Sequence, residues 1–527
     1  MSMQRRDFLK SGVALAVAAE LGANHAHALV RAHNWGQYNF GSGPTVSDRL
    51  NQGPFPQFPP DAAIPSDEVV MTTTPSEDVV PNYGKGLVTY ITADMGTEEI
   101  KSDNIPQAIE DLVRFPLGQQ LYLRPTWREI QPRPGRLEFP DYIKLTFDLA
   151  KKNNKRIGMR IQMSAPDYWH QPALPDFILD KVPTVELVPD PKEAGTSAAR
   201  FMKNPYSRYQ PRYDHAFFQQ SFNELVGLLA AEYNGSPTIE FIDTFFYGFW
   251  GEGHTWPFLN NPFPDYPTAE RTWVNMLEVQ LEHFTKTPLM TNTQPDYSRV
   301  GNSELLDRTV RSNNWIRSDT IFIENEQIEA LSNRPAWIAV MIEQGVPGKP
   351  PDPNAVREGI SPSDNIISHV MDVGANYWSL WNFHAISAQN LMNYYQAFPA
   401  WFDRINRRVG YRVRPSFIWS YEDDGYLGII IGFANDGIAG VPGVLRVTVE
   451  SEDGKALKSG CLDAGYPLPG KVRQAQFVLP TGTKWQGLKL RAEIEVKGMR
   501  YPVRWACHQK LNDDGSLTLR PNLHRGI

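Results

Sequence analysis

The sequence predicts an α/β protein: a TIM (β/α)8 barrel followed by a C-terminal antiparallel β-sandwich. Between residues 86 and 415, short apolar runs alternate with helical patterns, which is typical of a barrel of parallel strands. After Pro415, longer runs alternate apolar and polar residues, which indicates half-buried antiparallel strands. The length of 527 residues is about right for one large barrel and one smaller domain.

The first 28 residues are interpreted as an export signal. Arg5 and Arg6 stand in a segment that resembles the twin-arginine signal, and a weakly apolar stretch and a small-x-small cleavage site, Ala26–Ala28, follow. The apolar stretch is too short to span a bilayer stably. We therefore expect a mature protein that begins near Leu29. It would leave a bacterial cytoplasm folded, through the twin-arginine machinery, and be periplasmic or secreted.

Residues 29–85 are predicted to be an extended arm. Eight prolines fall between Pro44 and Pro81. Proline removes a backbone donor and fixes φ, so neither a helix nor a central strand fits here. The arm either wraps the barrel or stays mobile, and the sequence leaves both open.

Eight strands and several helices are predicted for the barrel, residues 86–415. The strands are expected, in order, at Gly86–Ile91, Gln120–Arg124, Arg156–Met163, the run that begins at Ile239, Leu289–Thr293, a poorly marked segment within Thr309–Phe322, Ala336–Ile342 and Ala375–Leu380. Helices are expected at Asp141–Lys152, His215–Tyr233, Glu270–Thr285 and Ile366–Val373. An insertion rich in Pro and Tyr separates the third strand from the helix that begins near His215.

The sandwich, residues 416–527, is predicted from strand-like runs such as Leu427–Ile431 and Leu488–Val496, separated by Asn-Asp-Gly and Asp-Asp-Gly turns. Both cysteines of the chain, Cys461 and Cys507, fall within this domain. They could form a disulfide in an exported protein, or remain two buried thiols.

Composition excludes several classes of function. A net charge of −7 without a long basic run argues against a nucleic-acid partner. Two cysteines cannot build a Cys-based metal site, and no HExxH, Walker or GxGxxG motif occurs, so neither a metal nor another cofactor is expected. The aromatic content of 12% suits either an aromatic core or rings that stack on sugars.

The stretch Ile239–Trp256 contains the first candidate catalytic residue. A buried strand is followed by two glycines and then by Glu252, among the aromatic side chains Tyr247, Trp250, His254 and Trp256. The C-terminal ends of barrel strands carry catalytic groups. Aromatic surroundings would raise the pKa of Glu252, as a general acid requires. The alternative is a loop carboxylate that caps a helix or pairs with an arginine.

A second carboxylate, Glu343, directly follows the seventh strand. Two carboxyl groups across one cleft are what glycoside hydrolysis requires, one to protonate the leaving oxygen and one to attack or activate water. Glu324 and Glu326, after the sixth strand, are rivals for this second role.

Acids at the ends of strands four and seven resemble the catalytic pair of the retaining (β/α)8 glycoside hydrolases of clan A. The segment Tyr122–Phe139 is similar to the "W..iEP.pG.ydf" passage of β-galactosidase-like members, and Arg124 matches the arginine that these enzymes place near the nucleophile. Tyr377–Trp381 resembles their tryptophan-bearing eighth strand. The resemblance implies carboxyl groups roughly 5 to 5.5 Å apart. One departure is Gly251, where the clan usually has an asparagine that contacts a sugar hydroxyl.

Further residues are candidates for contacts with a sugar. They are Arg124, Trp127, Arg160, Gln162, Tyr247, Trp250, His254, Asn313, Asn314, Trp315, Trp378 and Trp381. Arg160 and Gln162 are equally compatible with a polar pair inside the barrel, and a single loop histidine is more often structural. Because side chains alternate along a strand, at most one of the last two tryptophans is expected to face the cleft, and Trp378 is favoured.

The sequence leaves three functions open. The first is an exported retaining glycosidase that acts on an oligo- or polysaccharide. The second is a sugar-binding barrel without catalytic activity, which the glycine at position 251 favours. The third is a polysaccharide lyase in which Arg124 or Arg160 binds a uronate.

Overall fold

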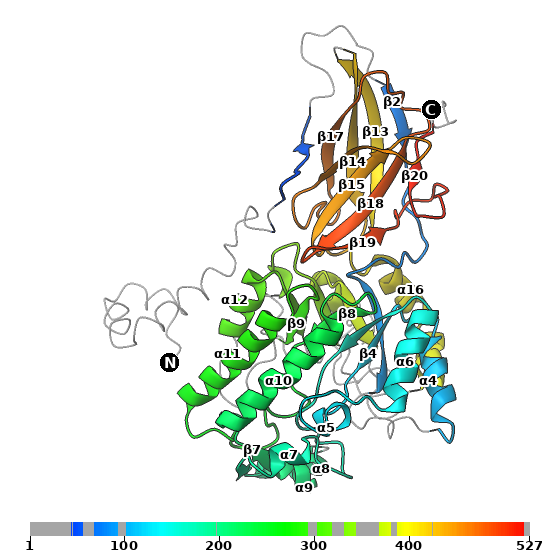
Figure 1. Cartoon of the computed structure of the whole chain (residues 1–527). Helices are drawn as coiled ribbons and strands as arrows, with labels where there is room; N and C mark the ends of the chain where they lie inside the picture. The colour runs from blue at the N-terminus through cyan, green and yellow to red at the C-terminus, as the bar shows by residue number, and fades with distance from the viewer. Residues whose placement is uncertain are drawn as a thin grey trace, which may run out of the picture.

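The computed structural model describes residues 44, 46–55, 68–92, 102–196, 198–292, 303–318, 331–343, 368–380, 387–423 and 425–520. These residues form a helix-covered barrel and a two-sheet unit that sits on one end of it (Figure 1). The predicted fold class is confirmed.

Eight parallel strands close the barrel, in the order β10-β11-β12-β3-β4-β5-β8-β9. The strands are β3 Gly86–Thr92, β4 Gln120–Leu123, β5 Arg156–Met159, β8 Ile239–Asp243, β9 Leu289–Asn292, β10 Trp315–Ser318, β11 Val340–Glu343 and β12 Tyr377–Leu380. All eight predicted positions hold a strand. The third is shorter than expected, because continuous pairing stops at Met159, and an isolated parallel bridge joins Gln162 to Thr126.

Helices cover the outside of the barrel (Figure 1). They are α4 Ile105–Val113, α5 Trp127–Ile130, α6 Asp141–Lys152, α10 Ala216–Tyr233, α11 Tyr266–His283, α12 Ser303–Arg311, α15 Ala388–Ala397 and α16 Pro399–Arg408. Helix α6 has the predicted bounds. Helix α11 begins earlier than predicted, because the Asp265 side chain accepts a hydrogen bond from the Thr268 amide at 2.8 Å and caps it.

The insertion lies at the end of the barrel farther from the sandwich (Figure 1). It contains α7 Asp176–Leu179, β6 Thr184–Glu186, the 3-10 helix η3 Pro191–Glu193, α8 Ala199–Lys203, α9 Pro205–Arg208 and β7 Tyr209–Pro211. Strands β6 and β7 form a small antiparallel pair.

Aromatic side chains fill the middle of the barrel. Tyr90 and Tyr122 are paired across β3 and β4, and their rings lie 4.8 Å apart. The ring of Phe241 contacts both Tyr122 and Tyr377. Gly158 makes this packing possible, because a Cβ there would lie 2.3 Å from the Phe241 ring. The barrel is thus a packed core, and polar chemistry is confined to its ends.

Two antiparallel sheets form the C-terminal unit. One has the order β1-β17-β14-β13-β2, and the other has the order β16-β15-β18-β19 with β20 paired to β18. The strands are β1 Asn51–Gln52, β2 Glu68–Thr72, β13 Val413–Asp423, β14 Tyr426–Asn435, β15 Val444–Glu450, β16 Ala456–Cys461, β17 Val472–Leu479, β18 Lys489–Val496, β19 Met499–Val503 and β20 Leu517–Thr518. Cys461 and Cys507 are both buried and free, so the two do not form a disulfide in this structure.

Two short strands of the proline-rich arm belong to the sandwich. Strand β1 pairs with β17, and β2 pairs with β13. Both are edge strands, the position in which a proline-rich segment is tolerated because half of its backbone groups need no partner. Farther along the arm, the Tyr83 hydroxyl donates a hydrogen bond to the Glu240 carbonyl of barrel strand β8 at 2.9 Å, so the arm contacts the barrel as well.

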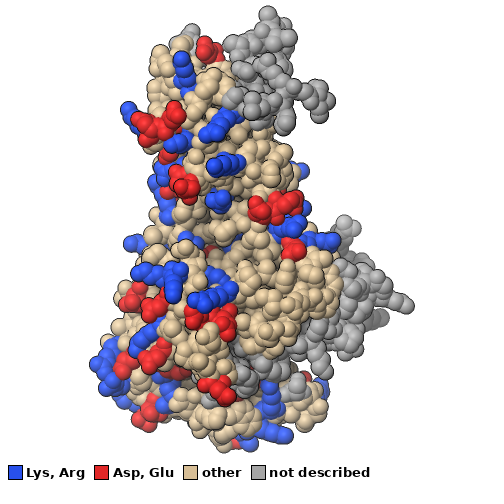
Figure 2. All heavy atoms as spheres, turned by 90° about the vertical axis from the view of Figure 1, so that its right-hand side faces the viewer, with Lys and Arg blue, Asp and Glu red and all other residues tan. Residues whose placement is uncertain are grey.

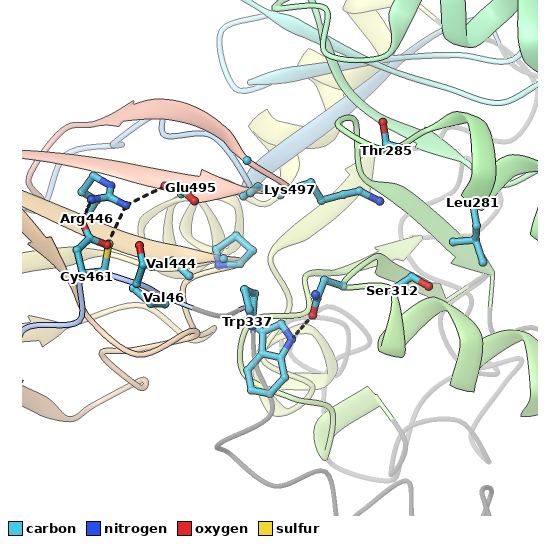
Figure 3. Close-up of a pocket in the computed structure, with 18 residues that line it drawn as sticks. Val46, Leu281, Thr285, Ser312, Trp337, Val444, Arg446, Cys461, Glu495 and Lys497 are labelled. Carbon is cyan, nitrogen blue, oxygen red and sulfur yellow. Dashed lines mark hydrogen bonds and ion pairs between the residues drawn. The ribbon is translucent and has the colours of Figure 1, made fainter.

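The junction between barrel and sandwich is built from buried polar groups and aromatic rings. The rings of Tyr83 and Tyr501 stack at 3.6 Å, and the Arg156 guanidinium lies over both. The buried carboxylate of Glu240 accepts hydrogen bonds from Tyr377 Oη at 2.6 Å and from the Gly84 amide at 2.8 Å. On another side of the junction, Lys497 points from the sandwich toward the barrel (Figure 3).

The surface carries mixed charge. Basic and acidic side chains are interspersed over the face shown in Figure 2. None of the described helices is long and apolar enough to cross a membrane.

Candidate active site

Three arginines and three carboxylates gather at the C-terminal ends of the barrel strands. Each is at most 6% exposed. The arginines are Arg124, Arg160 and Arg317, and the acids are Asp243, Glu252 and Glu343. Opposite charges are equal in number, and this balance is what allows six ionisable groups to be buried together.

Glu343 ends β11 and is held by donors on two other strands. Arg317 Nη2 of β10 lies 2.5 Å from its Oε2, and Tyr90 Oη of β3 donates to its Oε1 at 2.7 Å. Both side chains are buried. The carboxylate therefore acts as an acceptor toward a guanidinium and a phenol, an arrangement that suits a nucleophile.

Glu252 reaches the same cluster from the loop that follows β8. Arg160 Nη1 donates to its Oε1 at 2.7 Å, while Arg317 Nη1 lies 3.5 Å and Arg124 Nη1 3.8 Å from the same oxygen. Arg317 thus contacts Glu343 through one nitrogen and Glu252 through another. The two predicted catalytic residues are brought together around one guanidinium.

The electrostatic environment of Glu252 is the reverse of the one expected from the sequence. Burial raises the pKa of its carboxyl, but the charge of Arg160, the hydrogen bond from His254 and the charge of Arg317 outweigh this effect. The pKa of Glu252 is therefore held well below its ordinary range. The prediction that aromatic rings keep this residue protonated is wrong, because three arginines and His254 contact the carboxylate.

His254 orients Glu252 as a hydrogen-bond donor. Its Nδ1 accepts a hydrogen bond from the Trp256 amide at 3.2 Å, so the ring proton lies on Nε2, which is 3.3 Å from Glu252 Oε2. The structure thus places His254, a candidate for contact with a sugar, beside Glu252.

Gly251 explains how the loop turns Glu252 back onto the barrel. Its φ is +78°, and a Cβ at this position would lie 2.9 Å from the Ile161 carbonyl oxygen. An asparagine, usual at this position in clan A, would meet the same oxygen. The departure at Gly251 therefore has a backbone reason in this chain.

Asp243 and Tyr122 hold two of the three arginines, Arg160 and Arg317, in place. The Tyr122 hydroxyl donates to Asp243 Oδ2, and Arg160 Nε lies 3.0 Å from Tyr122 Oη and 3.3 Å from the same aspartate oxygen. Arg317 Nε lies 3.5 Å from that oxygen as well. Asp243 thus fixes two guanidinium groups whose other nitrogens face Glu252.

Other predicted contacts lie near the cluster without facing it. Trp127 is fully buried against Phe177 and Phe218, and its Nε1 donates to Gln131 at 2.7 Å. Tyr247 is buried and packs on Tyr213, Phe263 and Trp273. Gln162 donates to the Arg124 carbonyl at 2.7 Å. These three side chains support the structure around the site.

Trp250 is a predicted aromatic residue that lies beside His254. Its ring lies 5.6 Å from that of His254, and its Nε1 donates to the buried Asp167 at 3.2 Å. The side chain remains partly exposed. Trp250 is thus placed to contact a ligand next to His254.

Trp378, the residue favoured for stacking on a sugar, points away from the barrel interior. Trp378 is 1% exposed, and its ring lies 5.4 Å from Phe402 of α16, outside the barrel. Its neighbour Tyr377 points inward to Glu240. The preference for Trp378 is therefore wrong. Trp381, Glu324 and Glu326 lie outside the described residues.

The predicted cleft residues before the sixth strand lie at the opposite end of the barrel. Asn314 directly precedes β10, and its Oδ1 accepts hydrogen bonds from the Leu289 amide at 2.8 Å and from Lys497 Nζ at 2.9 Å. Asn313 accepts a hydrogen bond from Trp337 Nε1 at 3.1 Å, which is the dashed line at Trp337 in Figure 3. The expectation that Asn314 lines the cleft is wrong, because Asn314 lies at the N-terminal end of β10, whereas the glutamates lie at the C-terminal ends of the strands.

Sequence reasoning missed Tyr90, Asp243 and Arg317 as site residues. Each lies at or near the C-terminal end of its strand, with the side chain inside the barrel. Their positions within two residues of a strand end are the local signal that could have selected them. The run around Asp243 read as continuously apolar, and the strand of Arg317 was poorly marked.

The sequence matches no protein-family model and none of the curated proteins with which it was compared. Among solved structures, the chain is similar to endo-glycoceramidase II from Rhodococcus sp., with a TM-score of 0.37 and 10% identity over 77% of this chain and 100% of that one. It is also similar to a β-galactosidase from Marinomonas ef1, with a TM-score of 0.34 and 11% identity over 61% and 60% of the two chains. A third is an exo-β-1,4-mannosidase from Opitutaceae bacterium strain TAV5, with a TM-score of 0.33 and 10% identity over 61% and 59%.

Proposed function

We propose that the protein is a retaining glycoside hydrolase that acts on an oligo- or polysaccharide at the C-terminal end of the barrel. One observation carries the proposal: Glu252 and Glu343 arrive from different strands and contact the same guanidinium, that of Arg317. Two carboxyl groups at one point of a barrel rim are the minimum that double displacement at an anomeric carbon requires.

The roles follow from the contacts. Glu343 receives two hydrogen bonds that favour an acceptor, so it attacks the anomeric carbon. Glu252 delivers a proton to the leaving oxygen and then takes one from water. Because its pKa is held low in the structure, a sugar has to weaken the contact between Glu252 and Arg160 before the first step.

Two glutamine variants test this division. Glu343→Gln should abolish turnover of every substrate. Glu252→Gln should be slow on natural glycosides and should keep activity on aryl glycosides whose leaving group needs no proton. Azide should rescue Glu252→Ala and give a glycosyl azide of retained configuration. An inverted product from the wild type, or full activity of Glu343→Gln, would contradict the proposal.

A sugar-binding barrel without catalytic activity is the second candidate. The low pKa of Glu252 favours it, because the resting carboxylate lacks the proton that a general acid must give. Product analysis on a panel of plant, algal and bacterial polysaccharides decides between the two. Binding without any product, unchanged in Glu343→Gln, would support the second candidate.

We also propose export through the twin-arginine pathway, which rests on Arg5 and Arg6 alone. Replacing both with lysine should leave the protein in the cytoplasm. The amount of periplasmic protein measures this, and unchanged export would reject the assignment.

A further inference from the structure

A second concentration of arginines lies where α16 meets the sandwich. A cavity of about 670 Å³ is lined there by Arg404, Arg407, Arg408 and Arg412. We call it the arginine pocket. Its other walls come from the arm, residues 75–77, and from the sandwich, residues 435–437 and Gly470. It therefore joins three separate parts of the chain.

Three acids line the arginine pocket, Glu77, Asp403 and Asp436, and Asp403 accepts a hydrogen bond from Tyr395 Oη at 3.5 Å. Asp436 pairs with Arg414 at 2.7 Å, and Glu77 pairs with Arg407 at 3.3 Å. Arg404 and Arg408, one turn apart on α16, form no ion pair with any described residue. Two exposed guanidinium groups thus face the cavity with their charge uncompensated by a direct partner.

Arg412 adds a buried cation at the same place. It is 2% exposed, and its guanidinium donates to the Ser76 carbonyl at 2.6 Å and to the Asp78 carbonyl at 2.9 Å. No described carboxylate lies within ion-pairing distance of it. Burial lowers the pKa of Arg412, the charges of Asp436 and Glu77 oppose this shift, and the charge of Arg408 adds to it.

The simpler account is that basic residues in the last turn of a helix complement its dipole. This accounts for Arg407 and Arg408. It does not account for Arg412, which follows the helix and is buried, or for the cavity that all four side chains share. Four arginines around one cavity suit an anionic ligand.

We propose that the arginine pocket binds a sulfate or phosphate ester group carried on a larger molecule. Guanidinium groups match the oxygens of such groups through paired hydrogen bonds. The cavity is larger than one tetrahedral anion, so it leaves room for the molecule that carries the group. The pocket is next to the N-terminal end of β12, where the Gly410 amide donates to Ala375, and it is therefore separate from the proposed active site.

Calorimetric titration of the full chain at low ionic strength tests the proposal. The probes are inorganic sulfate, inorganic phosphate, glucose 6-sulfate and glucose 6-phosphate, and comparison of the four shows which anion and which carrier is preferred. Arg404→Gln/Arg408→Gln should weaken binding at least about tenfold, because it removes the two uncompensated charges. Glu77→Gln should tighten binding, because it removes an acid from the rim and frees Arg407.

Lys151→Gln/Lys152→Gln is the matched control. These lysines also end a barrel helix, α6, and lie outside the arginine pocket. The proposal is supported if the wild type and this control bind the anion, the arginine variant does not, and Glu77→Gln binds it more tightly. No binding by the wild type, equal binding by all variants, or equal loss in the arginine and lysine variants would overturn it. If the arginine variant fails to fold, the direction of the Glu77→Gln effect decides.

Discussion

Arg317 Nη2 lies 2.5 Å from Glu343 Oε2, and both side chains are buried at the C-terminal end of the barrel. The same guanidinium reaches Glu252 and Asp243 through its other nitrogens. Arg317 is thus the common partner of three carboxylates on two strands and one loop. It connects the proposed nucleophile to the proposed proton carrier.

Arg317→Gln should cost both activity and stability. Removing one partner of a buried ion pair typically destabilises a protein by about 3–5 kcal/mol, because the carboxylates keep their burial and lose their counter-charge. Urea unfolding measures the loss. Arg271→Gln, an exposed change on α11, is the control and should shift the unfolding free energy by less than about 0.5 kcal/mol. If Arg317→Gln unfolds at the same urea concentration as the wild type, the ion pairs of the cluster do not contribute to stability.

The low pKa of Glu252 predicts an acidic activity profile on substrates that need a proton. A general acid works in its protonated form, so kcat/KM should fall as pH rises above that pKa. His254→Phe removes a donor to the carboxylate and should move this descending limb to higher pH. The pH dependence of kcat/KM for both proteins checks the sign. If the descending limb stays at the same pH in His254→Phe, His254 does not lower the pKa of Glu252.

Gly251→Asn should damage the site although it restores the residue usual in clan A. The left-handed backbone and the 2.9 Å approach to the Ile161 carbonyl predict a loss of about 1–3 kcal/mol and a displaced Glu252. Gly135→Asn is the matched control, since Gly135 has φ +83° and no atom within 4 Å of its Cβ position. Equal losses in the two variants would assign the effect to φ alone.

Trp378→Ala should act on stability and not on sugar binding. The ring is buried against Phe402, so its removal should cost about 3–5 kcal/mol of unfolding free energy. Trp169→Ala, at a tryptophan that is 44% exposed, serves as the control for truncation of the same side chain. Loss of sugar affinity in a fully folded Trp378→Ala protein would contradict the outward orientation.

Because Lys497 is buried, the unfolding free energy should change with pH in the alkaline range. Burial lowers its pKa to about 8, below the ordinary value of 10.5. Between these values the unfolded chain binds more protons than the folded one, so the unfolding free energy should rise with pH across this window. Lys497→Met should reduce that rise, as measured by urea unfolding at both ends of the window. Lys155, whose pKa burial also lowers to about 8, should account for a similar share.

The sequence by itself determined the order of strands and helices and the two glutamates. Apolar runs and helical patterns depend on neighbouring residues only, so the positions of the barrel strands, apart from the poorly marked sixth, and the bounds of α6 could be predicted from them. Glu252 and Glu343 could be selected because their distance from a strand end is also a local property.

Tertiary structure alone decided what those glutamates contact. Arg317 comes from β10 and Tyr90 from β3, and no local pattern shows that they meet Glu343 on β11. The direction of the Glu252 pKa shift followed from the same fact, since the charges that outweigh burial come from other strands. The barrel also turned Trp378 outward and placed Asn314 at the far end. Burial, charge balance and side-chain direction depend on residues distant in sequence, and closure of the barrel brings those residues together.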